Sequence, residues 1–269
     1  MQAALLSLLV FLLVCFLYIH VVHQRRESND CEVVSVPVRN SEAFSEMVGL
    51  RCPFIYTINV EGFKEALPLD ALKTEEVAYS SYDASGVVTG NETCDRGIYA
   101  WSDVLGTYEM RTCIRDMDKL CAPYAKVSSD VLVVIPSLTT VAPPRRNTHC
   151  RTLIVCASGA LKVRLWSPVS GRRLAYHYDA ARESHIASDT DFTKSTVECI
   201  IREGDVLCIP SRWWHSIITE DEGIALVFRY RSMSNALANI VDVGRTILSK
   251  HQVGGQLAKS VLGGVCKIE

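Results

Sequence analysis

The sequence predicts a mainly β domain, built as a sandwich or a barrel, that follows an apolar N-terminal helix. The second half of the chain consists of short runs rich in β-branched and aromatic residues, which is the composition of strands. Turn signals such as Ser158-Gly159 and Gly204-Asp205 separate these runs, and no long helical pattern lies between them, which argues against a βαβ sheet. In addition, residues 1–24 contain no Asp, Glu, Lys or Arg.

Seven short strands are predicted from these runs, each bounded by turn residues. After the last strand, apolar residues follow a helical spacing, which predicts a helical C-terminal tail. This tail either packs against its own barrel or forms the face of a homodimer. The strands cover residues 131–135, 152–156, 161–166, 197–201, 206–209, 216–219 and 224–230, and the stripe of the tail consists of Leu237, Ile240, Val241, Val243, Ile247 and Leu248.

Composition excludes two classes of protein. The chain carries 28 Lys and Arg against 30 Asp and Glu, and a dedicated nucleic-acid-binding protein normally has a basic excess. A hydrophobic content of 48% excludes a disordered chain, and 269 residues are enough for one domain with a sizeable core. The predicted organisation is an anchor at residues 1–24, a polar stalk at 25–49, the β domain at 50–232 and the helical tail at 233–269.

The N-terminal segment predicts an uncleaved, single-pass membrane anchor. Residues 3–22 form an apolar run, and a helix of about 20 such residues crosses a bilayer. The alternative is a cleaved signal peptide. Against it, no Lys or Arg precedes the run, the run is long, and no clear small-x-small cleavage site follows.

Two sets of features predict opposite orientations for this membrane anchor. Arg25 and Arg26 follow the helix and favour a cytoplasmic domain. The glycosylation sequon at Asn91 and ten cysteines outside the anchor favour an oxidising compartment. Several of those cysteines (Cys150, Cys156, Cys199 and Cys208) sit in apolar runs, where a thiol also packs as a small hydrophobe. The sequence slightly favours the lumenal or exterior side, with the cytoplasmic side as the alternative.

The most informative stretch runs from Gly204 to Ile217. A Gly-Asp turn leads into an apolar strand, Pro210 ends it, and two Trp precede His215 at the start of the next strand. This stretch closely resembles the last metal-ligand motif of the jumonji-C and related cupin-like hydroxylases. The resemblance covers roughly residues 50–231 and is also carried by Ser158-Gly159, by the run from Lys162 to Pro168, by Cys52-Pro53-Phe54-Ile55 and by Trp101-Ser102-Asp103-Val104-Leu105.

The resemblance implies a double-stranded β-helix (a cupin or jelly-roll fold) with peripheral helices. In that family the His of the Trp-Trp-His motif binds Fe(II), so His215 is the only matching metal-ligand position. The family supplies its other two ligands as His-x-Asp, about a dozen residues before the Ser-Gly turn. Counting back from Gly159 without gaps, those positions are Arg146 and Thr148. A guanidinium has no lone pair to offer a metal.

Two further positions depart from the family. His149 needs a three-residue slip to replace the missing ligand, and it would then pair with Arg151 instead of a carboxylate. The position at which many relatives carry a Lys that binds 2-oxoglutarate holds Leu161. Strand alternation places Leu161 and its apolar neighbours inside the barrel and Lys162 outside.

Three arginines are candidates for binding an anion. Arg145, Arg146 and Arg229 either line an anion-binding pocket or are ordinary surface charges.

The sequence therefore predicts a membrane-anchored cupin- and jumonji-like domain that is a catalytically impaired relative of Fe(II)/2-oxoglutarate-dependent hydroxylases. No catalytic or cofactor-binding residue is assigned, no cofactor is expected, and the function is binding or structural, toward an unknown protein partner or peptide. The alternative is an active protein hydroxylase that uses Fe(II) and 2-oxoglutarate, with His215, His149 and a distant carboxylate as ligands.

Overall fold

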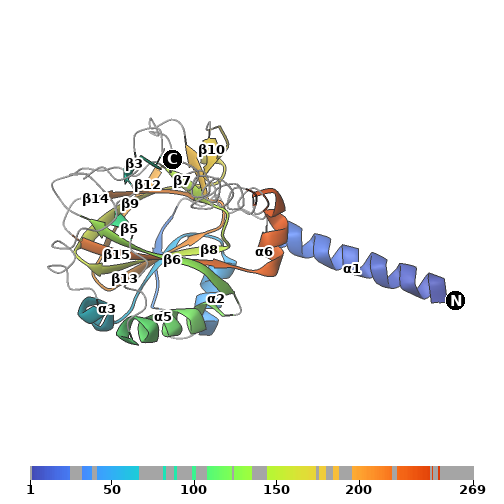
Figure 1. The fold of residues 1–269 in the computed structure, drawn as a ribbon, viewed down its shortest axis with the longest axis horizontal. Coiled ribbons are helices and arrows are strands. Elements are labelled where there is room, and N and C mark those ends of the chain that lie inside the picture. The colour runs from blue at the N-terminus through green and yellow to red at the C-terminus, as the bar shows by residue number, and fades with distance from the viewer. Residues whose placement is uncertain are drawn as a thin grey trace, which may run out of the picture.

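Two β sheets, antiparallel except for one pair of strands, face each other and enclose an apolar core (Figure 1). They are seen in a computed structural model that describes residues 2–24, 32–37, 41–66, 81–82, 88–89, 99–100, 108–122, 124–134, 144–173, 176–179, 184–187, 196–219, 223–242, 244 and 248. The predicted helical tail beyond residue 248 and the sequon at Asn91 lie outside these residues.

The larger sheet has the strand order β1-β2-β13-β8-β15-β6-β5, and its neighbours are antiparallel except for the parallel pair β1 and β2. Its strands are β1 (Val34–Ser35), β2 (Phe54–Thr57), β5 (Tyr99–Ala100), β6 (Ala125–Val134), β8 (Arg151–Ser158), β13 (Asp205–Pro210) and β15 (Gly223–Arg231).

The smaller sheet has the order β10-β11-β7-β14-β9-β12 and is antiparallel throughout. Its strands are β7 (Arg145–Asn147), β9 (Ala160–Trp166), β10 (Tyr176–Asp179), β11 (Ser184–Ala187), β12 (Thr196–Arg202) and β14 (Trp214–Thr219). A short 3-10 helix, η2 (Ser170–Arg173), follows β9, and β3 (Ser81–Tyr82) and β4 (Val88–Thr89) form a separate hairpin.

All seven predicted strands are present, with boundaries that shift by a few residues. The sequence did not predict β7, β10 and β11, which are three or four residues long and mostly polar. All three lie at one end of the smaller sheet, beside the strand that carries His215.

Strand alternation divides the side chains of the sheets between two faces. On β9, Leu161, Val163 and Leu165 are fully buried in the cluster between the sheets. Lys162 and Arg164 lie on the opposite face, where both pair with Glu198 of β12. The prediction that the apolar residues of this strand face inward, with Lys162 outside, is confirmed.

Three helices cover the outer face of the larger sheet (Figure 1): α2 (Ser41–Gly49), α3 (Glu61–Ala66) and α5 (Tyr108–Cys121). Phe44 of α2 is fully buried there, with its ring centroid 5.6 Å from those of Phe54 and Tyr56. The predicted polar stalk over residues 25–49 is therefore corrected. Its second half folds onto the sheet because Phe44 completes an aromatic cluster, and β1 extends the sheet edge.

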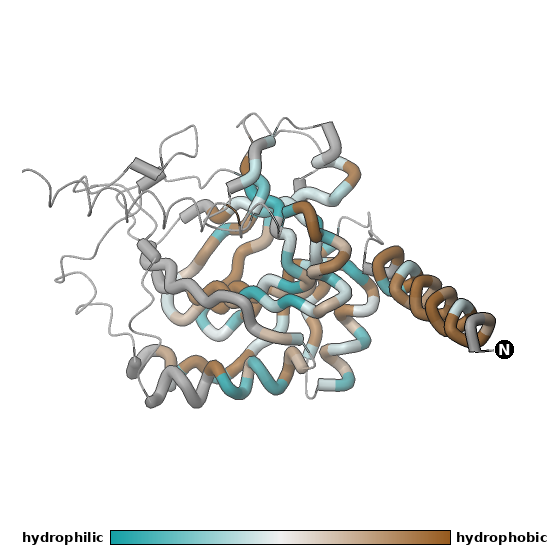
Figure 2. The backbone as a smooth tube through the Cα atoms, turned by 45° about the vertical axis from the view of Figure 1, so that its right-hand side comes forward, coloured by the Kyte–Doolittle hydropathy of each residue, from teal (hydrophilic) through white to brown (hydrophobic). Residues whose placement is uncertain are grey.

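The first helix, α1 (Gln2–Gln24), is long and apolar enough over residues 4–22 to cross a membrane, by length and composition. Figure 2 shows its apolar character along its length and its projection away from the sheets. It contacts α6 (Met233–Ala238), which follows β15. The Ser232 side chain caps α6 by accepting a hydrogen bond from the backbone N–H of Asn235 at 3.0 Å.

The apolar stripe predicted for the tail is largely exposed where it is described. Leu237, Ile240, Val241 and Leu248 all expose more than a third of their surface. These side chains are thus not covered by their own barrel.

Candidate functional site

His215 is placed by a tight turn between the two sheets. Strand β13 ends at Pro210, and the turn that follows contains Arg212 in the left-handed region, with φ at 70°. Trp213 is buried next to it and donates its indole N–H to the backbone oxygen of Arg51 at 3.2 Å. Strand β14 then begins, and His215, 7% exposed, is its second residue.

The neighbours of His215 are basic. Arg145 of β7 is directly opposite it in the antiparallel ladder, so the two side chains project from the same face of the sheet. Burial, and then the positive charges of Arg229 and Arg145, lower the pKa of His215 from 6.5 to about 3. At neutral pH this histidine is therefore an uncharged imidazole between two guanidinium groups. Its Nδ1 is buried and has no hydrogen-bond partner among the described residues.

This arrangement does not fit a 2-His-1-carboxylate iron site. Such a site places two imidazoles and one carboxylate on one face of the metal. Within the described residues, no group of three His, Cys, Asp or Glu side chains lies together in a way that suits a metal ion. The position directly opposite His215, where a second ligand would share its face, holds Arg145.

The hydrogen-bond register shows where Arg146, one of the two positions that gap-free counting gave for the missing ligands, lies relative to His215. Arg146 is opposite Trp214, not His215, and so lies on the other face of the sheet. There its guanidinium carbon is 4.9 Å from the ring centroid of Tyr176 and 5.5 Å from that of Trp214. A shift of one residue along a strand exchanges the two faces, so a count along the sequence is sensitive to a difference of one residue. The residue directly opposite His215 is Arg145, and the next residue of β7 on the same face is Asn147.

The other predicted residues are dispersed. Thr148 and His149 are buried in the turn between β7 and β8. Thr148 Oγ1 accepts a hydrogen bond from Arg231 at 3.4 Å. Arg151 is 3% exposed and points to the helix-covered face, where its guanidinium carbon is 3.9 Å from the ring centroid of Tyr124.

The position at which many relatives carry a Lys that binds 2-oxoglutarate holds an apolar residue that faces the core. Leu161 and its alternate residues on β9 fill the core, and Lys162 Nζ is 3.0 Å from a carboxylate oxygen of Glu198 on the outer face. Hydrogen bonds from Arg164 and Lys162 lower the pKa of that exposed carboxyl. Lys162 is therefore part of a surface ion pair and does not reach the space around His215.

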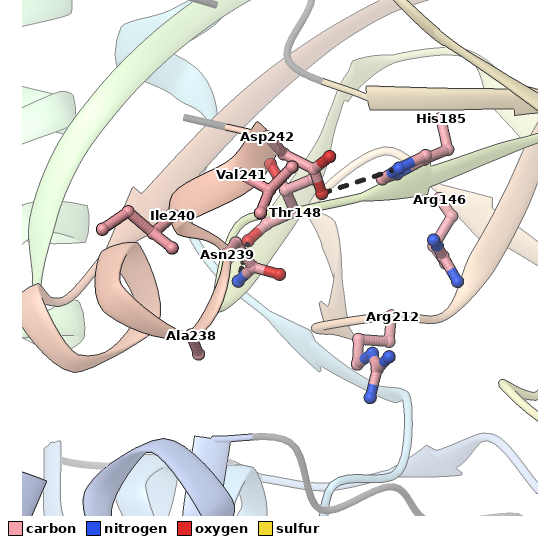
Figure 3. Close-up of a pocket in the computed structure, with 9 residues that line it drawn as sticks. All are labelled: Arg146, Thr148, His185, Arg212, Ala238, Asn239, Ile240, Val241 and Asp242. Carbon is pink, nitrogen blue, oxygen red and sulfur yellow. Dashed lines mark hydrogen bonds and ion pairs between the residues drawn. The ribbon is translucent and has the colours of Figure 1, made fainter. Parts of the chain in front are cut away.

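The three arginines predicted to form one anion site are divided between two places. Arg145 and Arg229 act on His215 between the sheets. Arg146 lines a cavity of about 290 Å³ on the opposite face of the smaller sheet (Figure 3). The lining of this cavity consists of Arg146, Thr148, His185, Arg212, Ala238, Asn239, Ile240, Val241 and Asp242.

Sequence reasoning did not identify His185, Arg212 or Asp242 as a group. His185 lies on a four-residue strand and Asp242 follows α6, and the two are 3.6 Å apart between Nε2 and Oδ2. No spacing within the sequence connects these residues, because the fold alone brings β11, the turn before β14 and the tail together.

Comparison with known proteins supports the resemblance seen in the sequence. A protein-family model described as a JmjC domain matches residues 114–237. The chain is 37% identical over 65 residues to the arginine-specific demethylase JMJ22 of Arabidopsis thaliana, which is 24% of this chain and 13% of that protein. It is 32% identical over 82 residues to the tRNA wybutosine-synthesizing protein 5 of Gallus gallus, which is 27% of this chain and 25% of that protein. The matches thus span a quarter or less of the length of these relatives.

Proposed function

Because residues 114–237 of this chain belong to the jumonji-C family, we propose that it is a membrane-anchored member that has lost the iron site and acts by binding instead of oxidation. We further propose that its fold is the double-stranded β-helix of that family. The support for the fold is the pair of facing antiparallel sheets, in which β13-β8-β15-β6 oppose β7-β14-β9-β12.

The observation that carries the loss of iron is the pairing of His215 with Arg145. A metal bound to His215 would have to approach a permanent cation on the same face, and Arg229 adds a second positive charge nearby. The same two charges that lower the pKa of His215 also oppose Fe(II), since both a proton and a metal ion bring positive charge to the imidazole. No step of an oxygenase reaction is assigned to this chain for that reason.

The rival function is an active protein hydroxylase with a non-standard metal site built on His215 and His149. The activities that the names of the two relatives state, arginine demethylation and wybutosine synthesis, make an enzymatic role a serious alternative. The two proposals differ in what His215 does. As an iron ligand it is essential for metal content, whereas in a binding protein its removal leaves metal content unchanged.

Metal analysis separates them. Full-length protein, purified in detergent from cells grown with added iron, is analysed for metal and assayed for 2-oxoglutarate turnover as succinate release. We expect no stoichiometric iron and no succinate above the blank, in the wild type and in the matched variant His215→Ala alike. One iron per chain with turnover, both lost in His215→Ala, would overturn the proposal in favour of the hydroxylase.

The proposed anchor is α1, and the membrane is the partner of residues 3–22. The sequon at Asn91 supports a domain on the lumenal or exterior side. In the described part of the chain, Cys121, Cys150, Cys156, Cys199 and Cys208 are free thiols, so these five add no support for an oxidising compartment. A lumenal domain gives an endoglycosidase-sensitive mobility shift that disappears in Asn91→Gln. Complete protease sensitivity from the cytoplasmic side would instead place the domain in the cytoplasm.

A further inference from the structure

We propose that the cavity lined by Arg146, Arg212 and His185 is a binding site for a phosphate group. The site lies on the face of the smaller sheet opposite to His215, so this inference is independent of whether the barrel binds iron. Of its lining, the sequence pointed only to Arg146 as a candidate anion-binding residue, and it grouped Arg146 with Arg145 and Arg229 instead of with Arg212 and His185.

The sheet register assembles the core of the site. In the antiparallel ladders, Arg146 pairs with His185 of β11 on one side and with Trp214 of β14 on the other. Directly opposed residues share a face, so these three side chains form a row across the outer face of the smaller sheet. Arg212, in the turn that precedes β14, brings a second guanidinium to the same cavity. Figure 3 shows the two guanidinium groups on one side of it and the residues that follow α6 on the other.

The guanidinium group of Arg146 is positioned by contacts with aromatic rings and not by an ion pair with a carboxylate. Its guanidinium stacks against Tyr176 and Trp214, and it has no ion-pair partner within the described part of the chain. Stacking fixes the plane of the group but leaves its N–H donors able to bind a ligand. A positioned guanidinium binds phosphate oxygens with short, charge-assisted hydrogen bonds.

His185 of β11 lines the same cavity. Its side chain is 5% exposed, its Nε2 faces Asp242 at 3.6 Å, and its Nδ1 is buried without a hydrogen-bond partner among the described residues. An imidazole offers one polar nitrogen on each side of its ring, so His185 adds a polar group to the lining of the cavity.

The remaining polar groups suit an anion with more than two oxygens. Thr148 Oγ1 accepts a hydrogen bond from Arg231, and a hydroxyl can donate as well as accept. Two guanidinium groups, an imidazole and a hydroxyl therefore surround the cavity with donor groups from different elements. Among the described residues of the lining, Asp242 is the acidic one, and its Oδ2 is 3.6 Å from Nε2 of His185. Among the same described residues, the two arginines outnumber this single carboxylate.

The phosphate group has two candidate sources, a soluble phosphorylated compound and a phospholipid headgroup. The second is suggested by the other wall of the cavity, which includes the exposed apolar residues Ile240 and Val241 just after α6. Helix α6 contacts α1, the proposed membrane anchor. The proposal that the phosphate belongs to a lipid thus rests on the proposed membrane anchoring of α1. The proposal that the cavity binds a phosphate group does not depend on that anchoring.

The test uses the full-length chain and measures its thermal unfolding midpoint. In detergent, inorganic phosphate is compared with chloride at equal ionic strength. In nanodiscs, phosphatidylcholine alone is compared with phosphatidylcholine plus phosphatidic acid. We expect a rise of the midpoint with phosphate, or with phosphatidic acid, because a ligand of the folded state stabilises it. The expected loss of affinity in Arg146→Gln and in Arg212→Gln is about tenfold or more, as estimated for a charge-assisted contact.

Two variants keep the outcome interpretable. Arg202→Gln removes an exposed arginine on β12, away from the cavity, and should keep the full rise. Arg146→Lys keeps the charge and should keep part of it. A rise with inorganic phosphate assigns a soluble ligand, and a rise with phosphatidic acid alone assigns a lipid. No rise in either arm, or a rise that Arg146→Gln and Arg212→Gln leave unchanged, overturns the proposal, whatever the iron analysis gives.

Discussion

His215 and Arg145 lie directly opposite each other in the ladder between β14 and β7. The position beside His215 on the same face of the sheet therefore holds a guanidinium and not a second imidazole. Because both side chains project from one face, neither can turn away without breaking the alternation of its strand. In this proposal, the iron site was lost through substitutions at individual residues, while the fold that would carry the site is retained. Substitution of those residues should therefore restore the site.

The double variant Arg145→His with Asn147→Asp should restore metal binding. It places a His-x-Asp pair on the strand that faces His215 and removes one of the two cations. We expect the retention of Co(II) after gel filtration to rise from a background level to about one ion per chain. The matched control, Arg146→His with Thr148→Asp, follows the gap-free count and should gain nothing. Binding by the control pair alone would show that Arg146, and not Arg145, shares a face with His215.

His215 should make stability depend on pH. In the folded protein its pKa is lowered to about 3, whereas in the unfolded chain it is near 6.5. Between these values the unfolded state binds one more proton, so the free energy of unfolding falls as the pH is lowered, by at most about 1.4 kcal/mol per pH unit. Urea unfolding at pH 7.5 and pH 4.5 should therefore show a steeper loss for the wild type than for His215→Gln, which has no imidazole to titrate. Equal losses would contradict the burial of a neutral imidazole.

The cysteines of the core should react slowly. Burial raises the pKa of Cys121, Cys156 and Cys199 to about 12, and the thiolate is the reactive form. With iodoacetamide under native conditions we expect these thiols to be alkylated at least about a hundredfold more slowly than the half-buried Cys52. Peptide mass spectrometry of a time course gives the rates, and urea should abolish the difference. Recovery of any of these cysteines in a disulfide would contradict their assignment as free thiols.

Phe44→Ala tests whether α2 belongs to the domain. Phe44 is fully buried in the aromatic cluster with Phe54 and Tyr56, and its truncation should lower the free energy of unfolding by about 3–5 kcal/mol. The control Leu50→Ala removes a side chain that is 60% exposed and should change stability by about 0.5 kcal/mol or less. An effect of Phe44→Ala as small as that of the control would return this segment to the predicted stalk.

The sequence predicted those strands whose residue composition alone favours a β conformation. Long runs of β-branched residues predicted β8, β9 and β15, since those strands are buried on one or both faces. Strand β7 is different, because it consists of Arg145, Arg146 and Asn147. No local preference makes three polar residues a strand, and β7 exists because β11 and β14 pair with it on both sides.

The candidate site could be predicted only in part, because its geometry also depends on the pairing between strands. The motif before His215 identified the family, but counting could not decide which of Arg145 and Arg146 shares its face, since that depends on hydrogen bonds between strands. The cavity on the other face was beyond sequence reasoning. His185 and Asp242 are far apart in the chain and meet only after the tail folds back over β11.

The pairing of β1 with β2 limits how far the domain can stand from a bilayer. Helix α1 ends at Gln24 and β1 begins at Val34, so the tether consists of residues 25–33 only. At full extension nine residues span about 30 Å, roughly the thickness of a bilayer core. With α1 in a membrane, the domain can sample only a thin layer next to the lipid surface. Partners embedded in or held at the same membrane would meet it at high local concentration, whereas a soluble partner would have to come to that surface.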